Sequence, residues 1–355
     1  MDMAFGVLTA REPQEVVAQL VDSLGQRDSV FVHHDYSQQP AFEVAREGVR
    51  LIPDYIRTGW GEPSLARAIF HLIRTALASS DFDYFQLLSG SCLPLQPVAA
   101  LKSHLARRRS PILADLVNLD TDERALMSHG HRVFCRSQKL AARLLRRSRR
   151  WYFGESPVTI QQSNLGIHER VAPGAELTAM QWLGRKIHVA ARAGLLDSHP
   201  FHGGMTPYVG SLWFCLRRDV CEYLVRQEER NSSVPYLMDL KVCDEVLFPS
   251  LLGNSGFAIA PSNHLVNRFS GAHPRTFEVA DLPTVVASEQ FFARKFAMDA
   301  MDPCRQAVID LLIDRVDQQR SPSGYVPLPE PFQSAVLASG AERQGVVVDT
   351  LPLDR

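Results

Sequence analysis

The chain has 355 residues, of which 45% are hydrophobic and 22% are charged, and its formal net charge is −1. This is the composition of a globular protein with one large domain or two fused lobes. Because 38 basic residues are balanced by 39 acidic ones, the overall charge does not favour a nucleic-acid partner. The N-terminus lacks the charged region of a signal peptide, and no segment reaches the roughly 20 apolar residues of a membrane span. Six scattered cysteines without CxxC pairs predict buried, reduced thiols in a cytoplasmic protein.

The first third of the chain alternates between predicted strands and helices. Short apolar and β-branched runs predict strands at 4–8, 29–35, 48–52, 83–89 and around 111–116. Helical spacing of apolar residues predicts helices at 12–24, 62–78 and 98–106. This alternation predicts an α/β fold with a mostly parallel, doubly wound Rossmann-type sheet and helices on both faces.

The rest of the chain is less regular. Residues 136–150 hold seven Lys or Arg and no acid, and Leu140, Leu144 and Leu145 form a narrow apolar stripe. We expect an exposed amphipathic helix whose basic face is either simply solvated or contacts an anionic acceptor or anionic membrane lipid. The pattern then predicts a loop-rich region to about 207, a strand at 208–216, a helix at 218–229, a strand at 256–261 and an extended Pro-rich arm past 320.

These elements predict one large domain with a C-terminal extension. We expect residues 1–300 to form the domain, with a nucleotide-binding half at 1–119 and an acceptor and catalytic half at 120–300. Residues 301–355 are expected to form a C-terminal helix followed by the Pro-rich tail.

Ligands of parallel sheets bind at the carboxyl ends of the strands. In this chain those ends carry Thr9, Ala10 and Arg11, then His33, His34 and Asp35, then Ser89, Gly90 and Ser91. The second group has ligand types that a metal-dependent phosphohydrolase uses, but no HxxxH pair or further His/Asp cluster completes such a site. We therefore expect Asp35 to accept a hydrogen bond from a nucleoside NH or hydroxyl group.

The segment CDEVLF (243–248) supplies a candidate base. It is expected to begin a helix, where the helix dipole favours anionic side chains. Adjacent helical residues point about 100° apart, so only one of Asp244 and Glu245 can face a cleft. We expect Asp244 to cap the helix and Glu245 to act as the base.

Two cations follow the candidate base, Arg275 and Lys295. Lys295 lies in FFARKF (291–296), where a basic pair is placed between aromatic residues. A guanidinium grips phosphate oxygens bidentately and an ammonium acts as a point charge, so together they could replace a divalent ion on a departing diphosphate. The DxD spacings of Asp81/Asp83 and Asp120/Asp122 are a competing manganese signal, but the first pair lies at the start of its strand, at the end opposite the ligands.

The chain resembles the core-2/I-branching β-1,6-N-acetylglucosaminyltransferase family, with its peptide O-xylosyltransferase, plant and bacterial relatives. The resemblance runs from about residue 4 to residue 299, and its landmarks occur in the family's order. These are FVHHD (31–35), WGEPSL (60–65), FDYFQLLSGSCLPL (82–95), GSLWFCLRRDV (210–220), CDEVLF and FFARKF.

The resemblance implies a GT-A-like fold and inverting, metal-independent transfer from a UDP-sugar, with no cofactor. It implies that Glu245 is the general base and that Lys295, with Arg275, holds the diphosphate. It further implies that the donor is bound by Asp35, Thr9, Ala10, Arg11, Trp60 and Gly90. It implies that the acceptor is contacted by Ser211, Trp213 and Asp244. The family's proline before Asp-Glu is Cys243 here and its LSG-D-P aspartate is Cys92, which leaves the sugar and the acceptor open.

The sequence therefore predicts a glycosyltransferase that moves GlcNAc, or secondarily xylose, from a UDP-sugar to an acceptor hydroxyl of a glycan or lipid-linked acceptor. By analogy we expect a cytoplasmic enzyme of bacterial surface polysaccharide or lipopolysaccharide synthesis, peripheral to the inner membrane through the basic helix. Two alternatives stay open: a non-catalytic nucleotide-fold protein that docks on an anionic surface, and the phosphohydrolase centred on His33, His34 and Asp35.

Overall fold

The computed structural model describes residues 1–39, 43–44, 46–136, 138–154, 158–162, 164–169, 176–267, 269–270 and 273–320. Its centre is a seven-stranded sheet in which only the pairs made by β11 are antiparallel. In spatial order the strands are β12 (Ile259–Ala260), β6 (Ile112–Leu113), β11 (Cys215–Arg217), β4 (Tyr84–Ser89), β1 (Met3–Thr9), β2 (Ser29–His34) and β3 (Val49–Leu51).

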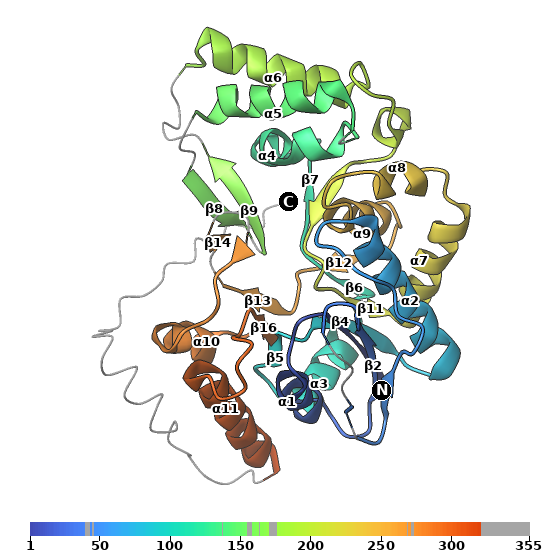
Figure 1. Cartoon of the computed structure of the whole chain (residues 1–355), viewed down its shortest axis with the longest axis vertical. Coiled ribbons are helices and arrows are strands. Elements are labelled where there is room, and N and C mark those ends of the chain that lie inside the picture. The colour runs from blue at the N-terminus through green and yellow to red at the C-terminus, as the bar shows by residue number, and fades with distance from the viewer. Residues whose placement is uncertain are drawn as a thin grey trace.

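Helices cover both faces of this sheet (Figure 1). Every residue of β1 is buried, as expected for a central parallel strand, and its side chains alternate between two cores. Met3, Phe5 and Val7 pack with α1 (Gln14–Ser23) and α3 (Val98–Arg108). Ala4 and Leu8 belong to the core of the other face, which is covered by α2 (Pro63–Ser79), α7 (Arg218–Arg230) and α9 (Asp244–Gly253). The predicted α/β class with a mostly parallel sheet is confirmed.

The helix predicted at 136–150 is confirmed as α5 (Leu140–Phe153), but the prediction that the chain is loop-rich from there to residue 207 is wrong, since that stretch contains a hairpin of β8 (Val158–Gln162) and β9 (Leu165–Glu169) and the helix α6 (Ala179–Arg192). Together with α4 (Glu123–Val133), α5 and α6 form a helical layer beyond the sheet (Figure 1). α6 begins with a capping box between Thr178 and Gln181. Its buried face consists of Gly184, His188 and Ala191, so the apolar periodicity that signals a core helix is missing.

The predicted strand 208–216 is in fact two strands of different sheets. β10 (Tyr208–Gly210) pairs with β7 (Leu116–Asn118), whereas β11 continues in the central sheet. The chain therefore changes sheets over residues 211–214, and this step carries Ser211 and Trp213 to the cavity described below.

The C-terminal part packs beside α1, at the lower left of Figure 1. β16 (Phe292–Arg294) joins β13 (His264–Val266) and β5 (Leu93–Pro94) in a small sheet. α10 (Leu282–Ala287) and α11 (Pro303–Arg320) share a core with it. The remaining short elements are α8 (Val234–Met238), β14 (Phe269–Ser270), β15 (His273–Pro274), η1 (Pro200–Gly203) and η2 (Val279–Asp281).

The structure also bears on the predictions about thiols and membrane spans. All six cysteines are buried and free, as predicted. Among the described residues, none of the helices combines the length and apolarity needed to cross a bilayer. The predicted Pro-rich arm lies outside the described residues.

Candidate active site

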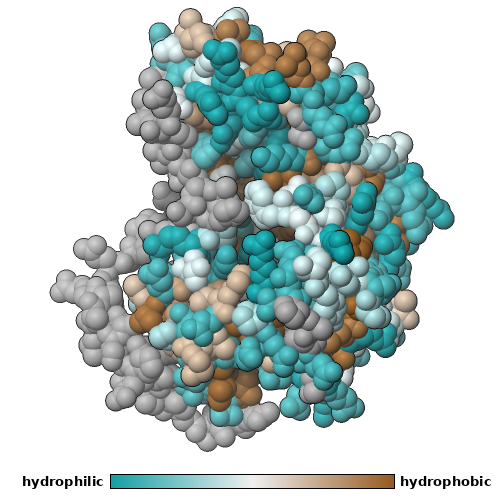
Figure 2. Space-filling view, in the orientation of Figure 1, coloured by the Kyte–Doolittle hydropathy of each residue, from teal (hydrophilic) through white to brown (hydrophobic). Residues whose placement is uncertain are grey.

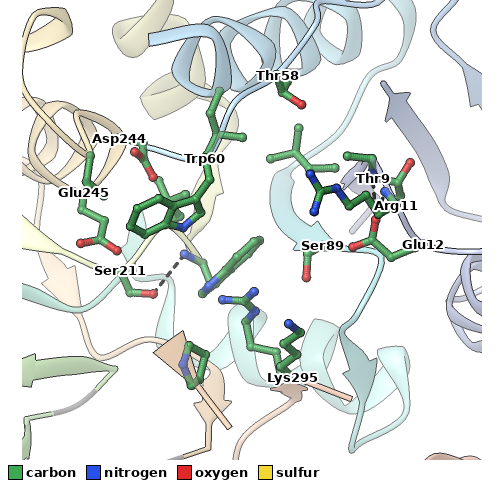
Figure 3. A pocket seen from close by; sticks show the side chains of 18 of the residues that line it. Thr9, Arg11, Glu12, Thr58, Trp60, Ser89, Ser211, Asp244, Glu245 and Lys295 are labelled. Atoms are coloured by element: carbon green, nitrogen blue, oxygen red, sulfur yellow. Dashed lines mark hydrogen bonds between the residues drawn. The ribbon is translucent and has the colours of Figure 1, made fainter. Parts of the chain in front are cut away.

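A cavity of about 730 Å³ opens at the carboxyl ends of β1 and β4. Most residues predicted for the site line it, namely Thr9, Ala10, Arg11, Trp60, Ser211, Trp213, Asp244, Glu245 and Lys295. Figure 3 shows Glu245, Asp244 and Ser211 on one side of this pocket and Thr9, Arg11 and Glu12 on the other. Asp35, Gly90 and Arg275, although described, are not part of its lining.

A strained turn directs the first turn of α9 into the cavity. Val242 has φ of 55°, a left-handed conformation that is unfavourable for a β-branched residue. Its backbone N–H donates to the carbonyl of Gly61, and Glu245 N–H donates back to the carbonyl of Val242. Because this turn precedes the helix, Asp244 and Glu245 are the first residues of α9.

Asp244 does not cap α9, contrary to the sequence-based expectation. Cys243 occupies the N-cap position, and no side-chain hydrogen bond caps the helix. Asp244 is 3% exposed, and its Oδ1 has no hydrogen-bond partner in the described part of the chain. Burial, followed by the neighbouring Glu245 carboxylate, raises the pKa of Asp244 from 3.8 to about 7. Both carboxyl groups therefore border the cavity, in different environments.

Glu245 pairs with Arg132 of α4. The Arg132 Nη1 donates to Glu245 Oε2 at 2.7 Å, and the side chain of Arg132 is 11% exposed while that of Glu245 is 35% exposed. Arg132 does not line the cavity, so it reaches the carboxylate from behind. Arg132 could not be predicted from the sequence, because no local pattern connects it with a residue more than a hundred positions away.

Two consecutive cations line the cavity: Arg294, the last residue of β16, and Lys295, which follows it. The guanidinium of Arg294 lies over the indole of Trp213, and its Nε is buried without a partner among the described residues. Burial lowers the pKa of Arg294, and the nearby Cys92 and Glu12 oppose that shift. In the described part of the chain no hydrogen bond or ion pair engages the Lys295 ammonium. Arg294 was missed although FFARKF contains it.

Arg275 is engaged elsewhere. Its Nη2 lies 3.3 Å from Asp281 Oδ1, and its side chain is 47% exposed. Its neighbour Pro274 lines the cavity, and Phe277 N–H donates to the carbonyl of Lys295, so the Arg275 segment runs close to the pocket. The structure thus brings Glu245 and Lys295 to one cavity and leaves Arg275 outside its wall.

Asp35 organises the loops beside the cavity. Its buried carboxylate accepts hydrogen bonds from Ser37, from Gln38 Nε2 at 2.7 Å and from Thr58 N–H at 2.7 Å. Burial opposes ionisation, but these hydrogen bonds prevail and lower the pKa of Asp35. Gln38 and Thr58 themselves line the cavity. Asp35 therefore holds the residues that a ligand would meet.

The loop after β1 is held in a similar way. Glu12 Oε2 accepts the N–H groups of Ala10 and Arg11, at 2.9 and 3.1 Å. A Cβ on Gly90 would lie 2.9 Å from Glu12 Cγ and 3.0 Å from Thr9 Cγ2. Gly90 thus allows the turn after β4 to approach this loop closely.

The residues of the rival metal sites have other partners. The Asp81 side chain is fully exposed, Asp83 accepts the N–H of Asp2, and both lie at the end of β4 remote from the cavity. Asp122 caps α4, and Asp120 pairs with Arg192.

The histidines of the second rival site are also engaged. His33 Nε2 accepts from Ile56 N–H at 2.9 Å, and His34 Nδ1 shares a hydrogen bond with Thr9 Oγ1 at 2.7 Å. Among the residues that the structure describes, no three His, Cys, Asp or Glu side chains are placed to hold a metal ion.

Comparison with known proteins bears on the family. None of the curated proteins matches the chain. The family model of the Core-2/I-Branching enzymes matches residues 3–155. This match contains Thr9, Arg11, Trp60 and Arg132, whereas Glu245 and Lys295 lie beyond it. The architecture, a mostly parallel sheet flanked by helices, is the GT-A-like one that the resemblance implied. Over residues 3–155 the chain therefore resembles the Core-2/I-Branching enzymes, a family of glycosyltransferases, as the motifs within that stretch indicated.

Proposed function

We propose that this chain is an inverting, metal-independent glycosyltransferase that transfers a sugar from a UDP-sugar to an acceptor hydroxyl. GlcNAc is the favoured sugar and xylose the second, and the expected setting is bacterial surface polysaccharide or lipopolysaccharide synthesis. The observation that carries the proposal is the joint placement of one carboxylate, Glu245, and two cations, Arg294 and Lys295, in the wall of one cavity.

In the proposed reaction Glu245 is the general base. The acceptor oxygen forms a bond to the anomeric carbon from the face opposite the diphosphate, and the bond from that carbon to the diphosphate oxygen breaks. Attack from that opposite face inverts the configuration at the anomeric carbon, and the acceptor hydroxyl proton passes to the Glu245 carboxylate. The contact with Arg132 supports this role, because it holds the Glu245 carboxylate at the wall of the cavity.

Arg294 and Lys295 are proposed to stabilise the negative charge that grows on the departing diphosphate. Arg294 is rigid against the Trp213 ring and has an unpartnered Nε, and Lys295 adds a second positive charge beside it. This assigns to Arg294 the guanidinium role first expected of Arg275, since Arg275 already pairs with Asp281.

The remaining wall suggests where each substrate lies. Thr9, Ala10 and Arg11, with the Thr58 and Gln38 groups held by Asp35, are proposed to receive the nucleoside, and Trp60 offers an exposed indole face nearby. Ser211, Trp213 and Asp244 are proposed to face the acceptor. Figure 3 shows Ser211 and Asp244 on the same side of the pocket as Glu245.

The function is tested by turnover and binding of three variants. Glu245→Gln should abolish transfer while UDP still binds, whereas a non-catalytic binding protein would keep its full phenotype. Arg294→Met should lower turnover by about 10²–10³-fold, the loss found when one preorganised electrostatic group is removed. Arg275→Met is the matched control and should leave most activity. Transfer should persist in EDTA, and a strict manganese requirement would overturn the proposed role of the cations.

A second proposed feature is peripheral contact with an anionic membrane. The exposed face of α5 carries Lys139, Arg143, Arg146, Arg147 and Arg150. The neighbouring α6 exposes Trp182 at 51% and Leu183 at 40%. Figure 2 shows apolar surface at the top of the view, over α6, and hydrophilic surface below it, over α5. Basic and apolar side chains on adjacent helices are what an anionic lipid surface would recognise.

A further inference from the structure

The Glu245 carboxylate has two oxygens in different situations. Oε2 accepts from Arg132 Nη1 at 2.7 Å, whereas Oε1 has no hydrogen-bond partner within the described residues. Arg132 approaches from the α4 side and is absent from the cavity wall, to which Glu245 belongs. One oxygen is therefore held by the protein, and the other is left for a ligand.

Arg132 is itself held, by His129 one turn earlier on α4. The Arg132 Nε lies 3.3 Å and its Nη2 3.1 Å from His129 Nδ1. A guanidinium can only donate, so His129 Nδ1 must be an accepting nitrogen and its proton must be on Nε2. Burial first, and then the Arg132 charge, hold the pKa of His129 well below 6.5. The imidazole is thus kept in the neutral form that this contact requires.

We propose that His129 and Arg132 are positioning residues that fix Glu245 through Oε2 and leave Oε1 to receive the acceptor proton. This rests on the proposed function, because it assumes that Glu245 is the base. An unanchored glutamate samples several rotamers, and a displacement of about 1 Å at the reacting atom can cost about 10²-fold in rate. Fixing one oxygen from behind avoids that loss without obstructing the cavity.

The charges around Glu245 provide a second test of the positioning proposal. The charged groups that face Glu245 are Arg132 from α4, Asp244 from its own helix and Arg294 from β16. Arg132 is in direct contact with the carboxylate, so its removal takes away the nearest positive charge. The acid limb of the kcat/KM profile should then move to higher pH, because an opposite charge nearby favours the ionised carboxylate.

The first test compares variants by steady-state kinetics. Arg132→Met should lower kcat by about 10²-fold and change the KM for the UDP-sugar by less than about twofold. Arg132→Lys should recover only part of the rate, since an ammonium cannot bridge Glu245 and His129 as a planar guanidinium does. His129→Asn places an amide oxygen near the Nδ1 position and should exceed His129→Leu in kcat.

The matched control is Arg185→Met, which breaks another ion pair of α4, that of Arg185 Nε with Glu123 Oε1 at 2.7 Å, outside the cavity. It should leave kcat and its pH profile unchanged. Equal kcat and equal pH profiles for Arg132→Met, Arg185→Met and the wild type would overturn the proposal. If the wild type transfers no sugar from any UDP-sugar, it is the proposed function that fails.

A measurement that does not depend on turnover distinguishes failure of the positioning proposal from failure of the proposed function. In protein labelled with ¹³Cδ-glutamate, the Glu245 signal is assigned by its loss in Glu245→Gln. Its titration midpoint should be higher in Arg132→Lys, and higher still in Arg132→Met, than in the wild type or Arg185→Met. An unchanged midpoint in both Arg132 variants would contradict the positioning contact whatever reaction the chain catalyses.

Discussion

The guanidinium carbon of Arg294 lies 4.3 Å from the centre of the Trp213 ring. Trp213 is 8% exposed, so the ring forms a fixed platform, and Arg294 rests on it with its Nε unpartnered in the described structure. A cation held by an aromatic face is not neutralised by its partner and can still bind an incoming anion, whereas the charge of a cation in an ion pair is already offset by the carboxylate. The contact therefore links Trp213, which lies where the chain passes from one sheet to the other, with a cation proposed to stabilise the departing diphosphate.

Trp213→Leu should weaken UDP binding by about tenfold, because a desolvated cation–π contact contributes up to about 2 kcal/mol and also orients the guanidinium. Trp213→Phe retains an aromatic face and should bind more tightly than Trp213→Leu. Calorimetric titration with UDP measures both. Trp182→Leu is the control, since Trp182 carries the Lys186 ammonium at 5.0 Å from its ring but lies on exposed α6. If Trp213→Leu bound UDP like the wild type, the platform would have no role in the donor site.

Asp244 should make the stability of the fold fall as pH rises from about 4 to 7. Its pKa is raised from 3.8 in the unfolded chain to about 7 by burial and by Glu245, so between these values the folded state binds a proton that the unfolded state does not. The stabilising contribution is fully present below pH 3.8 and is lost as pH approaches 7. Relative to Asp244→Asn, the wild type should lose roughly 2–3 kcal/mol of unfolding free energy between pH 5 and 7.

Urea unfolding of both proteins at several pH values provides the measurement. Asp81→Asn, a change at a fully exposed side chain, should follow the wild type. Parallel pH dependences for the wild type and Asp244→Asn would mean that Asp244 is already ionised in the fold at pH 5.

Much of the sheet could be predicted, because its central strands are rich in apolar and β-branched residues. β1, β2 and β4 are buried on both faces, so most positions in them are hydrophobic or β-branched, and α2 turns a regular apolar stripe towards them. α6 could not be predicted in the same way. It packs against α5 through Gly184 and exposes Trp182 and Leu183, which inverts the usual pattern.

The site was predictable where chemistry is carried by contiguous residues. Glu245 and Lys295 lie in short motifs, CDEVLF and FFARKF, and the structure brings both to the cavity. Arg275 has no such motif, and its pairing with Asp281 depends on a local turn. Arg132 and His129 act through a contact between α4 and α9, and long-range contacts leave no trace in the spacing of one sequence.

Gly184→Ala should destabilise the helical layer. A Cβ there would lie 2.6 Å from the backbone oxygen of Ser148, closer than α5 and α6 allow without moving apart. Overpacking of this kind costs about 1–3 kcal/mol. Thermal and urea unfolding should detect it, while Gly203→Ala, which would meet nothing within 4 Å, should stay within about 0.5 kcal/mol of the wild type. Equal stability of the two variants would mean that α5 and α6 adjust without cost.

The face formed by α5 and α6 should bind vesicles that contain phosphatidylglycerol and ignore vesicles of phosphatidylcholine alone. Each basic residue near an anionic surface contributes about 1 kcal/mol, so reversing Arg143 and Arg147 to glutamate should weaken binding by more than about tenfold in a sedimentation assay. Arg107→Glu with Arg108→Glu makes the same change in net charge on α3, away from this face, and should have little effect. Equal weakening by the two pairs would indicate a response to net charge alone. Binding that survives reversal of Arg143 and Arg147 but not Trp182→Ala with Leu183→Ala would place the contact on the apolar ridge of α6, with no need for anionic lipid.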